Sequence, residues 1–448
     1  MVSEPFLSAT LIAKNEVENV ERCLDSLWMH CDQIVVADTG STDGTIEKLR
    51  AYAKAVGPSR KLKIGRFKWV DDFAAARNYA DSLATGEWLV WGDFDDTIVG
   101  LGELRKMAEE ASPDVMAFFT HYTYAQDQND NVISELWRER LVRNHVSKWE
   151  GRLHEHKIFT HGQVLQVDPA IARWVHHKHM HSAASSERNL RILKAWDHDE
   201  PDNPRIIQSL GLEYLGGNDF ENAIPIFQRY LTFTEEPTER RAQASRYLAQ
   251  SLLQLGRVDE AEDVAFTSLR ETWGWTDTHL TLAEIAQTKG RPQEGLQHAF
   301  RAIEMGKPQS ILILNPTQYT AHPRAVAAVC EMQLGHYDEA MRWAKETLEI
   351  CPDYPLVATY LPGWKQTILR EQTVNAWLSC VQLLESHGEL TKAKELLSTA
   401  PTFAIDDPRL IAKRVGLWQA QENTPEPEPL DPESAARKFI ERHLEMAA

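Results

Sequence analysis

Two patterns of hydrophobic and polar positions follow one another along the chain. Up to about residue 200, short apolar runs alternate with polar turns and amphipathic stretches. The apolar runs 6–13 and 33–38 are each followed by a polar turn and then by helical spacing, over 20–28 and 46–52. This repetition of strand, turn and helix predicts a parallel sheet, whose ligands bind at the carboxyl ends of the strands.

A third apolar run ends in an acidic cluster. Residues 88–97 read Trp-Leu-Val-Trp-Gly-Asp-Phe-Asp-Asp-Thr, so Asp93, Asp95 and Asp96 directly follow a stretch of strand length. Carboxylates gathered in this way repel one another unless a cation neutralises them, and carboxylate oxygens suit Mg2+ or Mn2+. The alternative interpretation is that an Asp-rich turn merely ends the strand.

Polar residues also follow the first two apolar runs. Lys14, Asn15 and Glu16 come after the first run, and Asp38 and Asp43 come after the second. These residues are expected at the sheet edge where a nucleotide would bind; Asp38 would accept from a base N–H or a ribose hydroxyl, whereas Asp43 is interpreted as a turn cap. The chain has neither GxGxxG nor GxxxxGK[ST], which disfavours a dinucleotide-binding fold and a phosphate-loop NTPase.

Five short motifs occur in a fixed order in this part of the chain. They are Lys14-Asn15-Glu16, the stretch 38–45, Asp71-Asp72-Phe73-Ala74 with Arg77-Asn78, Thr85-Gly86-Glu87-Trp88, and the acidic cluster 93–96. In this order they resemble the family 2 glycosyltransferases of the GT-A fold, an α/β fold with a Rossmann-like sheet.

The resemblance implies a nucleoside-diphosphate sugar as donor, with a UDP-sugar favoured, and a bound Mn2+ or Mg2+. It places Asp38 and Arg77 near the base or ribose, and Asp93 and Asp95 on the metal. The donor-binding residues expected from it are Lys14, Asn15, Glu16, Asp38, Arg77, Asp93 and His177. The chain carries Phe94 where the family usually has a small residue, and this large side chain is expected to narrow the donor site.

The second half of the predicted sheet domain is less regular. The stretches 115–124 and 132–142 predict a hairpin. Residues 149–155 then look like the Trp-x-Gly-x-x-His-Glu segment of a branch of these transferases that carries C-terminal repeats. An inverting displacement needs a base for the acceptor proton. Glu155 is the favoured base, with Asp168 and Glu150 as alternatives, and Asp96 is expected to face the acceptor.

Histidines supply further candidate ligands. His154 is predicted as a metal ligand, although it could instead bind the diphosphate or cap its loop. In the histidine-rich stretch 175–181, His177 is favoured narrowly over His176 as a phosphate or metal contact. A solvated loop is the alternative, and the stretch lacks the paired spacing of a separate zinc site.

Beyond residue 200, small and aromatic residues recur at regular offsets. The offsets are similar to those of the tetratricopeptide repeat, a helical pair of about 34 residues that stacks into a solenoid. Two insertions, 306–323 and 351–373, interrupt the spacing. Both carry prolines with apolar or aromatic residues, so they are expected to be loops that bind something or, alternatively, to fill gaps in an irregular solenoid. The repeat positions are Gly211, Tyr214, Ala223 and Phe227; Ala249, Leu252, Ala261 and Ala265; Ala283, Ala286, Gly295 and Ala299; Ala328, Glu331, Ala340 and Ala344; and, more weakly, Val381, Leu384, Ala393 and Leu397.

Four segments are therefore predicted. Residues 1–200 form the GT-A domain and residues 201–421 a helical repeat domain. Residues 422–433, rich in Pro and Glu, form a linker, and residues 434–448 form an amphipathic helix that docks on the solenoid or on a partner chain.

Composition limits which compartment and which partners are expected for the protein. The net charge of -18 and the pI near 5.4 make nucleic acid an improbable partner, since broad phosphate binding needs clustered Lys and Arg. The five cysteines lack disulfide or zinc spacing. No signal peptide and no membrane-spanning run is recognised. These features predict a cytoplasmic protein.

The sequence thus predicts a metal-dependent, inverting glycosyltransferase. A peptide or protein acceptor, reached through the repeats, is the first choice, because repeat solenoids offer concave surfaces for protein recognition. A glycan, a lipid-linked saccharide or a hydroxylated nucleic-acid base is the alternative acceptor. A repeat scaffold with an inactive transferase domain is the alternative of another class, and a homo-oligomer through the repeats is the expected assembly.

Overall fold

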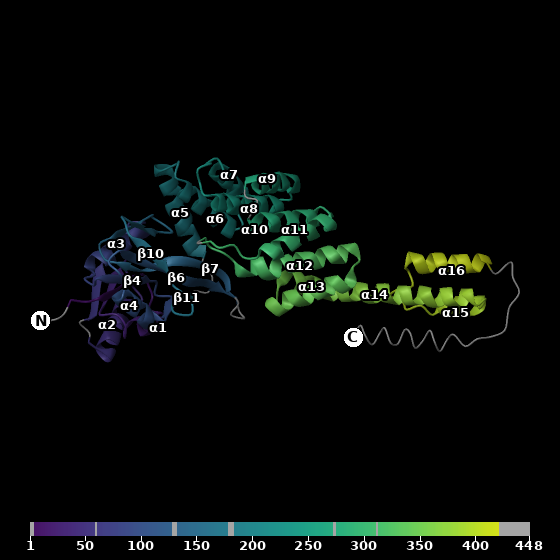
Figure 1. Cartoon of the computed structure of the whole chain (residues 1–448), viewed down its shortest axis with the longest axis horizontal. Coiled ribbons are helices and arrows are strands. Elements are labelled where there is room, and N and C mark those ends of the chain that lie inside the picture. Colours follow the sequence, from purple (N-terminus) through teal and green to yellow (C-terminus); the bar gives the residue numbers. More distant parts are fainter. Residues whose placement is uncertain are drawn as a thin grey trace. The chain divides into compact units, whose positions relative to one another are not determined.

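The computed structural model of the chain divides into two compact units, residues 1–327 and residues 328–448 (Figure 1). The structure describes residues 4–58, 61–127, 132–177, 183–271, 275–310 and 312–420. The predicted linker 422–433 and the predicted helix 434–448 lie outside these ranges.

The first strands form the predicted parallel sheet. Strand β1 pairs in parallel with both β2 and β4, and β2 pairs in parallel with β3. Their carboxyl ends therefore meet at one edge, which confirms the α/β prediction for this region. The strands are β1 (Leu7–Ala13), β2 (Gln33–Asp38), β3 (Leu62–Arg66) and β4 (Trp88–Gly92).

The remaining strands make the sheet mixed. The predicted hairpin is confirmed, since β6 (Val115–Gln126) and β7 (Val132–Arg143) pair antiparallel, and β7 continues the sheet beside β4. The full order is β3-β2-β1-β4-β7-β6-β11-β5, with β10 (Gln163–Gln166) against β6. The pairing of β5 (Asp96–Val99) with β11 (Arg173–His176) sets Asp96 opposite His176.

Helices cover the sheet and enclose one large apolar core. The helices of this region are α1 (Val20–Leu27), α2 (Thr45–Val56), α3 (Phe73–Leu83) and α4 (Leu101–Glu109). Phe94 is 1% exposed and lies within this core with Leu11, Cys23 and Trp174. The expectation that Phe94 narrows the donor site is therefore wrong, because the turn directs its side chain into the core.

Beyond the sheet domain, the first unit continues as antiparallel helix pairs. The residues predicted from the repeat offsets are buried, except for Tyr214, which is partly buried; for example, Ala223, Ala249 and Ala299 are fully buried. At Gly211, a Cβ would lie 2.8 Å from the Phe227 ring, so this close approach requires glycine. The helices are α5 (Ala183–Asp199), α6 (Pro204–Gly216), α7 (Phe220–Tyr230), α8 (Thr238–Gln254), α9 (Val258–Glu271), α10 (Thr276–Thr288), α11 (Pro292–Met305) and α12 (Pro316–Leu334), which runs into the second unit.

The two predicted insertions have different structures. Residues 306–315 connect α11 and α12, and the backbone of Leu314 exchanges hydrogen bonds with Glu135 of β7. The prediction of a loop over 351–373 is wrong for most of its length, because α14 begins at Pro355 and continues for 32 residues. Pro355 stands in the first turn of α14, where proline fits, whereas Pro362 stands inside the helix, which accommodates it.

Up to residue 420, where the described residues end, the second unit contains the end of α12 and four further helices. These are α13 (Tyr337–Ile350), α14 (Pro355–Ser386), α15 (Leu390–Ser398) and α16 (Pro408–Ala420). Val381, Leu384, Ala393 and Leu397, the weakest predicted register, lie in its apolar core.

All five cysteines are buried, and none of them forms a disulfide. In the part of the chain that the structure describes, no helix is both long enough and apolar enough to cross a membrane.

Candidate active site

The turns that follow β1 and β2 are joined by hydrogen bonds. The Lys14 ammonium donates to the Gly40 carbonyl, the Asn15 amide donates to the Ser41 hydroxyl at 3.0 Å, and the Thr42 amide donates to Asn15 Oδ1 at 2.8 Å. The structure thus brings Lys14, Asn15 and Asp38 together at one edge of the sheet, as predicted for a nucleotide site. Their contact with a nucleotide stays a prediction.

Asp38 and Glu16 are also fixed within these turns. Asp38 is buried at the end of β2, and its Oδ1 accepts the Ser41 amide at 2.9 Å. The Glu16 amide donates to the Thr45 hydroxyl at 2.8 Å, while Asp43 accepts from the Thr45 and Val17 amides. Asp43 is therefore the turn cap that its position predicts.

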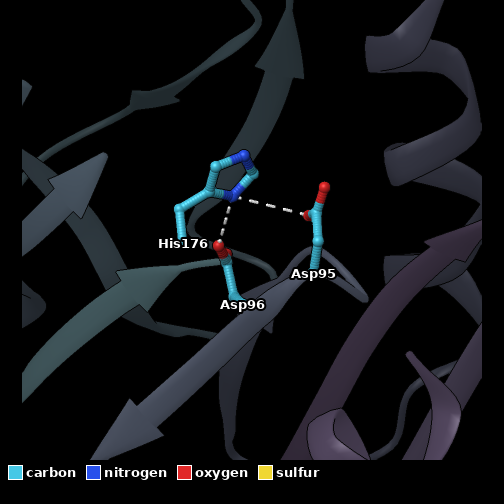
Figure 2. A group of neighbouring side chains, drawn as sticks. All are labelled: Asp95, Asp96 and His176. Carbon is cyan, nitrogen blue, oxygen red and sulfur yellow. Dashed lines mark hydrogen bonds and ion pairs between the residues drawn. The ribbon is translucent and has the colours of Figure 1, made fainter. Parts of the chain in front are cut away.

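Asp95, Asp96 and His176 form a compact group at the end of β4. One ligand-type atom from each lies within 4.8 Å of the others. Figure 2 shows the imidazole between the two carboxylates, with Nδ1 of His176 3.0 Å from Asp96 Oδ1 and 3.5 Å from Asp95 Oδ1. Burial opposes protonation of the ring, but the bond to Asp96 and the negative charges of the cluster raise the pKa of His176.

Asp96 is the most enclosed carboxylate of the cluster. It is 2% exposed, and its oxygens accept from the Tyr122 hydroxyl at 2.7 Å and from the Asp93 amide at 3.1 Å. Arg140 of β7, itself fully buried, lies 3.5 Å from its second oxygen. These contacts anchor the turn, and the predicted role of Asp96 towards an acceptor stays a prediction.

Arg77 joins the acidic turn to the predicted catalytic base. Its guanidinium donates to Asp93 Oδ1 at 2.7 Å and to Glu155 Oε1 at 2.5 Å. It also lies 4.8 Å from the ring centre of Trp91 and 5.1 Å from that of Trp149. Burial would raise the pKa of Asp93, but the charges of Arg77 and Arg140 outweigh it and lower that pKa to about 2.

The segment 149–155 is held from two sides. Leu153 packs against Ile192 and Trp196 of α5. Arg138 donates to the Glu155 carbonyl at 2.9 Å, and Arg205 of α6 donates to the His154 carbonyl at 2.6 Å. Helices of the repeat region therefore help to fix the loop that carries the predicted base.

The candidate histidines do not all lie at the acidic cluster. His154 is half exposed, and its Nε2 lies 3.8 Å from Glu213 on α6 rather than in the group of Asp95. The His177 amide donates to the Asp95 carbonyl at 2.8 Å, while its side chain is exposed. The ring that meets the carboxylates is that of His176, the alternative to His177. The ligand roles of His154 and His177 stay predictions.

The two alternative bases lie elsewhere. Asp168 is exposed and caps a turn by accepting the Ala170 amide at 2.8 Å. Glu150 pairs with Lys148 at 3.0 Å on the small sheet of β8 (Ser147–Glu150) and β9 (His156–Phe159). Of the three candidates, the structure brings only Glu155 into contact with the acidic cluster through Arg77.

Sequence reasoning missed Tyr122, Arg138 and Arg140. All three lie on the β6–β7 hairpin, whose residues carried no motif. One signal was available, because Arg138 and Arg140 alternate along a strand whose neighbouring residues Leu141 and Val142 are apolar. Charged residues that face one side of a strand can mark a polar site on that side.

The sheet order and the carboxylates at its edge define a domain of the GT-A type. Residues 8–175 match the family model of glycosyl transferase family 2, and residues 209–273 match a tetratricopeptide repeat model. The chain thus carries a family 2 glycosyltransferase domain of the GT-A fold, followed by tetratricopeptide repeats.

Three relatives share this resemblance. A TPR repeat-containing protein of Synechococcus elongatus is 26% identical over 46% of this chain and 51% of its own length. The SPbeta prophage-derived glycosyltransferase SunS of Bacillus subtilis is 24% identical over 53% and 56%. The lipopolysaccharide core biosynthesis glycosyltransferase LpsC of Rhizobium meliloti is 29% identical over 26% and 39%. The chain spans about half the length of the first two.

Proposed function

We propose that the protein transfers a sugar from a nucleoside-diphosphate sugar, with a UDP-sugar favoured, to an acceptor. The observation that carries this proposal is the group of Asp95, Asp96 and His176 at the carboxyl edge of the sheet. The family 2 match and the two relatives named as glycosyltransferases support it.

The residues of this group fit a divalent cation. Two carboxylates and one imidazole are ligands that Mn2+ accepts, and carboxylates alone suit Mg2+. Asp95 and His176 would bind the ion directly, and the more deeply buried Asp96 would lie next to them. Asp93 is the second carboxylate that the sequence predicts to bind the ion. Such an ion would offset the negative charge that develops on the leaving diphosphate.

Glu155 is the proposed base, and the transfer is proposed to invert the configuration at the anomeric carbon of the sugar. The side chain of Glu155 is 11% exposed, and its ion pair with Arg77 fixes the direction of its carboxylate. The same guanidinium fixes Asp93, so one buried cation sets the spacing between the metal side and the acceptor side of the site. Glu155 would take the proton from the acceptor group as that group displaces the nucleoside diphosphate from the sugar.

A polypeptide is the proposed acceptor, in a reducing compartment such as the cytoplasm. The tetratricopeptide match supports the first part, because stacked helical repeats present surfaces for protein recognition. The five cysteines, none of which forms a disulfide, support the second. A saccharide acceptor is the second candidate, favoured by the likeness of the sheet domain to LpsC.

Mass spectrometry of candidate acceptors tests this proposal. The protein would be incubated with Mn2+, a panel of nucleotide sugars, and either peptides or oligosaccharides. A hexose added to a peptide supports the first choice, and modification of saccharides alone would replace it by the second. A protein that turns over no nucleotide sugar would instead be a repeat scaffold with an inactive domain.

A further inference from the structure

Two arginines from distant parts of the first unit meet at the loop that carries Glu155. Arg138 comes from β7 and binds the carbonyl of Glu155, while Arg205 comes from α6 and binds the carbonyl of His154. Because these carbonyls belong to consecutive residues, the two guanidinium groups are close neighbours. Arg240 of α8, whose positive charge acts on Arg205, is counted with them, and the three are called the loop arginine cluster.

Arg205 has no counter-ion among the described residues. A guanidinium carries five N–H donors. That of Arg205 makes one side-chain hydrogen bond, to the His154 carbonyl, and its buried Nε meets no acceptor in the described part of the chain. A partly buried cation without a carboxylate partner is destabilising, and it is uncommon unless a ligand supplies the missing charge.

The neighbours of Arg205 add positive charge instead of cancelling it. Burial, Arg138 and Arg240 together lower the pKa of Arg205 to about 10, against a smaller opposing effect of Glu139 and Glu155. Burial and the nearby charge of Arg205 likewise lower the pKa of His156. The cluster is therefore a site of net positive charge.

Both nearby carboxylates already have cationic partners. Glu139 accepts from the Lys157 amide at 3.2 Å and lies 3.5 Å from Arg138, while Glu155 is paired with Arg77. Arg240 forms no ion pair with any residue that the structure describes. Of the three arginines, Arg138 alone pairs with a carboxylate of the described residues, which leaves an excess of positive charge beside the predicted base.

We infer that the loop arginine cluster binds an oxyanion, a phosphate or a carboxylate, carried by the acceptor. Guanidinium groups match both oxyanions in shape and charge. The inference rests on the proposed function, since it names a chemical group of the molecule that Glu155 would deprotonate. An oxyanion held beside the Glu155 backbone would orient the acceptor towards that carboxylate.

Titration of the full-length protein with inorganic phosphate, and separately with glutarate, tests the inference. EDTA is present throughout, so that no divalent ion draws phosphate to Asp95. Isothermal calorimetry should show saturable binding of at least one anion. Arg205→Gln and Arg240→Gln should each weaken it about tenfold, the effect of losing one charged hydrogen bond. The anion that binds identifies the source as phosphate or carboxylate.

Arg257→Gln is the matched control, because Arg257 lies exposed directly before α9 and pairs with Glu260. It should bind both anions as the wild type does. Circular dichroism checks each variant, and partly exposed Arg240 carries the test should Arg205→Gln fail to fold. Absence of saturable binding, or unchanged affinity in the folded variants, would overturn the inference.

Donor turnover of the same preparations, measured with Mn2+, separates this inference from the proposed function. Turnover without anion binding removes only the oxyanion site. Anion binding that depends on Arg205 or Arg240 supports the site, even in a protein that turns over no nucleotide sugar, in which case the proposed function fails and the acceptor assignment fails with it.

Discussion

The acidic turn and the loop arginine cluster differ in how their charges are balanced. In the turn, Arg77 pairs with Asp93, Arg140 lies beside Asp96, and His176 lies between Asp95 and Asp96. In the cluster, Arg205 has no carboxylate partner among the described residues. The comparison indicates that the turn is built to stay in place before any ligand binds, whereas the cluster is stabilised when an anion arrives.

The two regions also differ in how they are assembled. The acidic turn occupies four consecutive residues, and its partners Arg77, Arg140 and His176 come from α3, β7 and β11. The arginine cluster draws one residue each from β7, α6 and α8, so it exists only when the repeat helices pack on the sheet domain. Four changes test this contrast, from the largest expected effect to the smallest.

Phe94→Ala should have the largest effect, because Phe94 anchors the turn in the core. Removing a fully buried phenyl ring should lower the free energy of unfolding by about 4 kcal/mol. Urea denaturation measures it, with the exposed Phe403 replaced by Ala as control. A small loss of stability accompanied by tighter donor binding would instead place Phe94 in the donor site.

Arg77→Met should be the next most destabilising change. It removes the cation that Asp93 and Glu155 share, so Glu155 loses its ion-pair partner and Asp93 keeps the charge of Arg140, at a cost of about 3 kcal/mol. This value lies at the low end of the range because the Asp93 side chain is 35% exposed. Arg191→Met, which removes an exposed pair with Asp71, should change the unfolding curve little. Equal curves for the two variants would contradict the proposed pairing.

Acid should weaken the turn through Asp93. Its pKa is about 2 in the folded protein and about 3.9 when unfolded, so its contribution is complete above pH 4. The contribution is lost as the pH falls from 4 through 2, because the unfolded chain then binds more protons. The difference in unfolding free energy between wild type and Asp93→Asn should therefore shrink over this range. A difference independent of pH would exclude the Arg77 pairing as its cause.

Arg240→Gln should have the smallest effect and the opposite sign. Removing one of several like charges should raise the free energy of unfolding by about 0.5 kcal/mol in buffer without phosphate. If one of the anions binds the cluster, adding it should reverse the order of the two stabilities. Destabilisation of the variant in the absence of anions would show that Arg240 is already neutralised.

The sequence was sufficient to predict the sheet, the hairpin, the repeats and the acidic turn. Each depends on local periodicity: apolar runs before 14, 38 and 93, and small residues such as Ala249 and Ala261 at repeat offsets. The helix over 355–386 was missed because Pro355 and Pro362 were taken as loop signals, although proline fits a first turn and the helix accommodates the second.

The contacts within the site could not be predicted from the sequence. His176 and His177 are adjacent, and only the register of β11 against β5 decides that His176 faces Asp96. A shift of one residue would exchange them. Likewise, nothing local connects Arg77 with Glu155, which are 78 positions apart, or Arg205 with His154. Pairings of this kind come from tertiary packing.

The central claim is that Asp95 and its neighbours support sugar transfer from a nucleotide donor with a divalent ion. Its most direct test is the rate of UDP release from UDP-sugars with and without Mn2+, for wild type, Asp95→Asn and the exposed control Asp202→Asn. We predict Mn2+-dependent release that falls about a hundredfold or more in Asp95→Asn and is unchanged in Asp202→Asn. Release that is equal in wild type and Asp95→Asn, or absent from both with every nucleotide sugar tried, would contradict the claim.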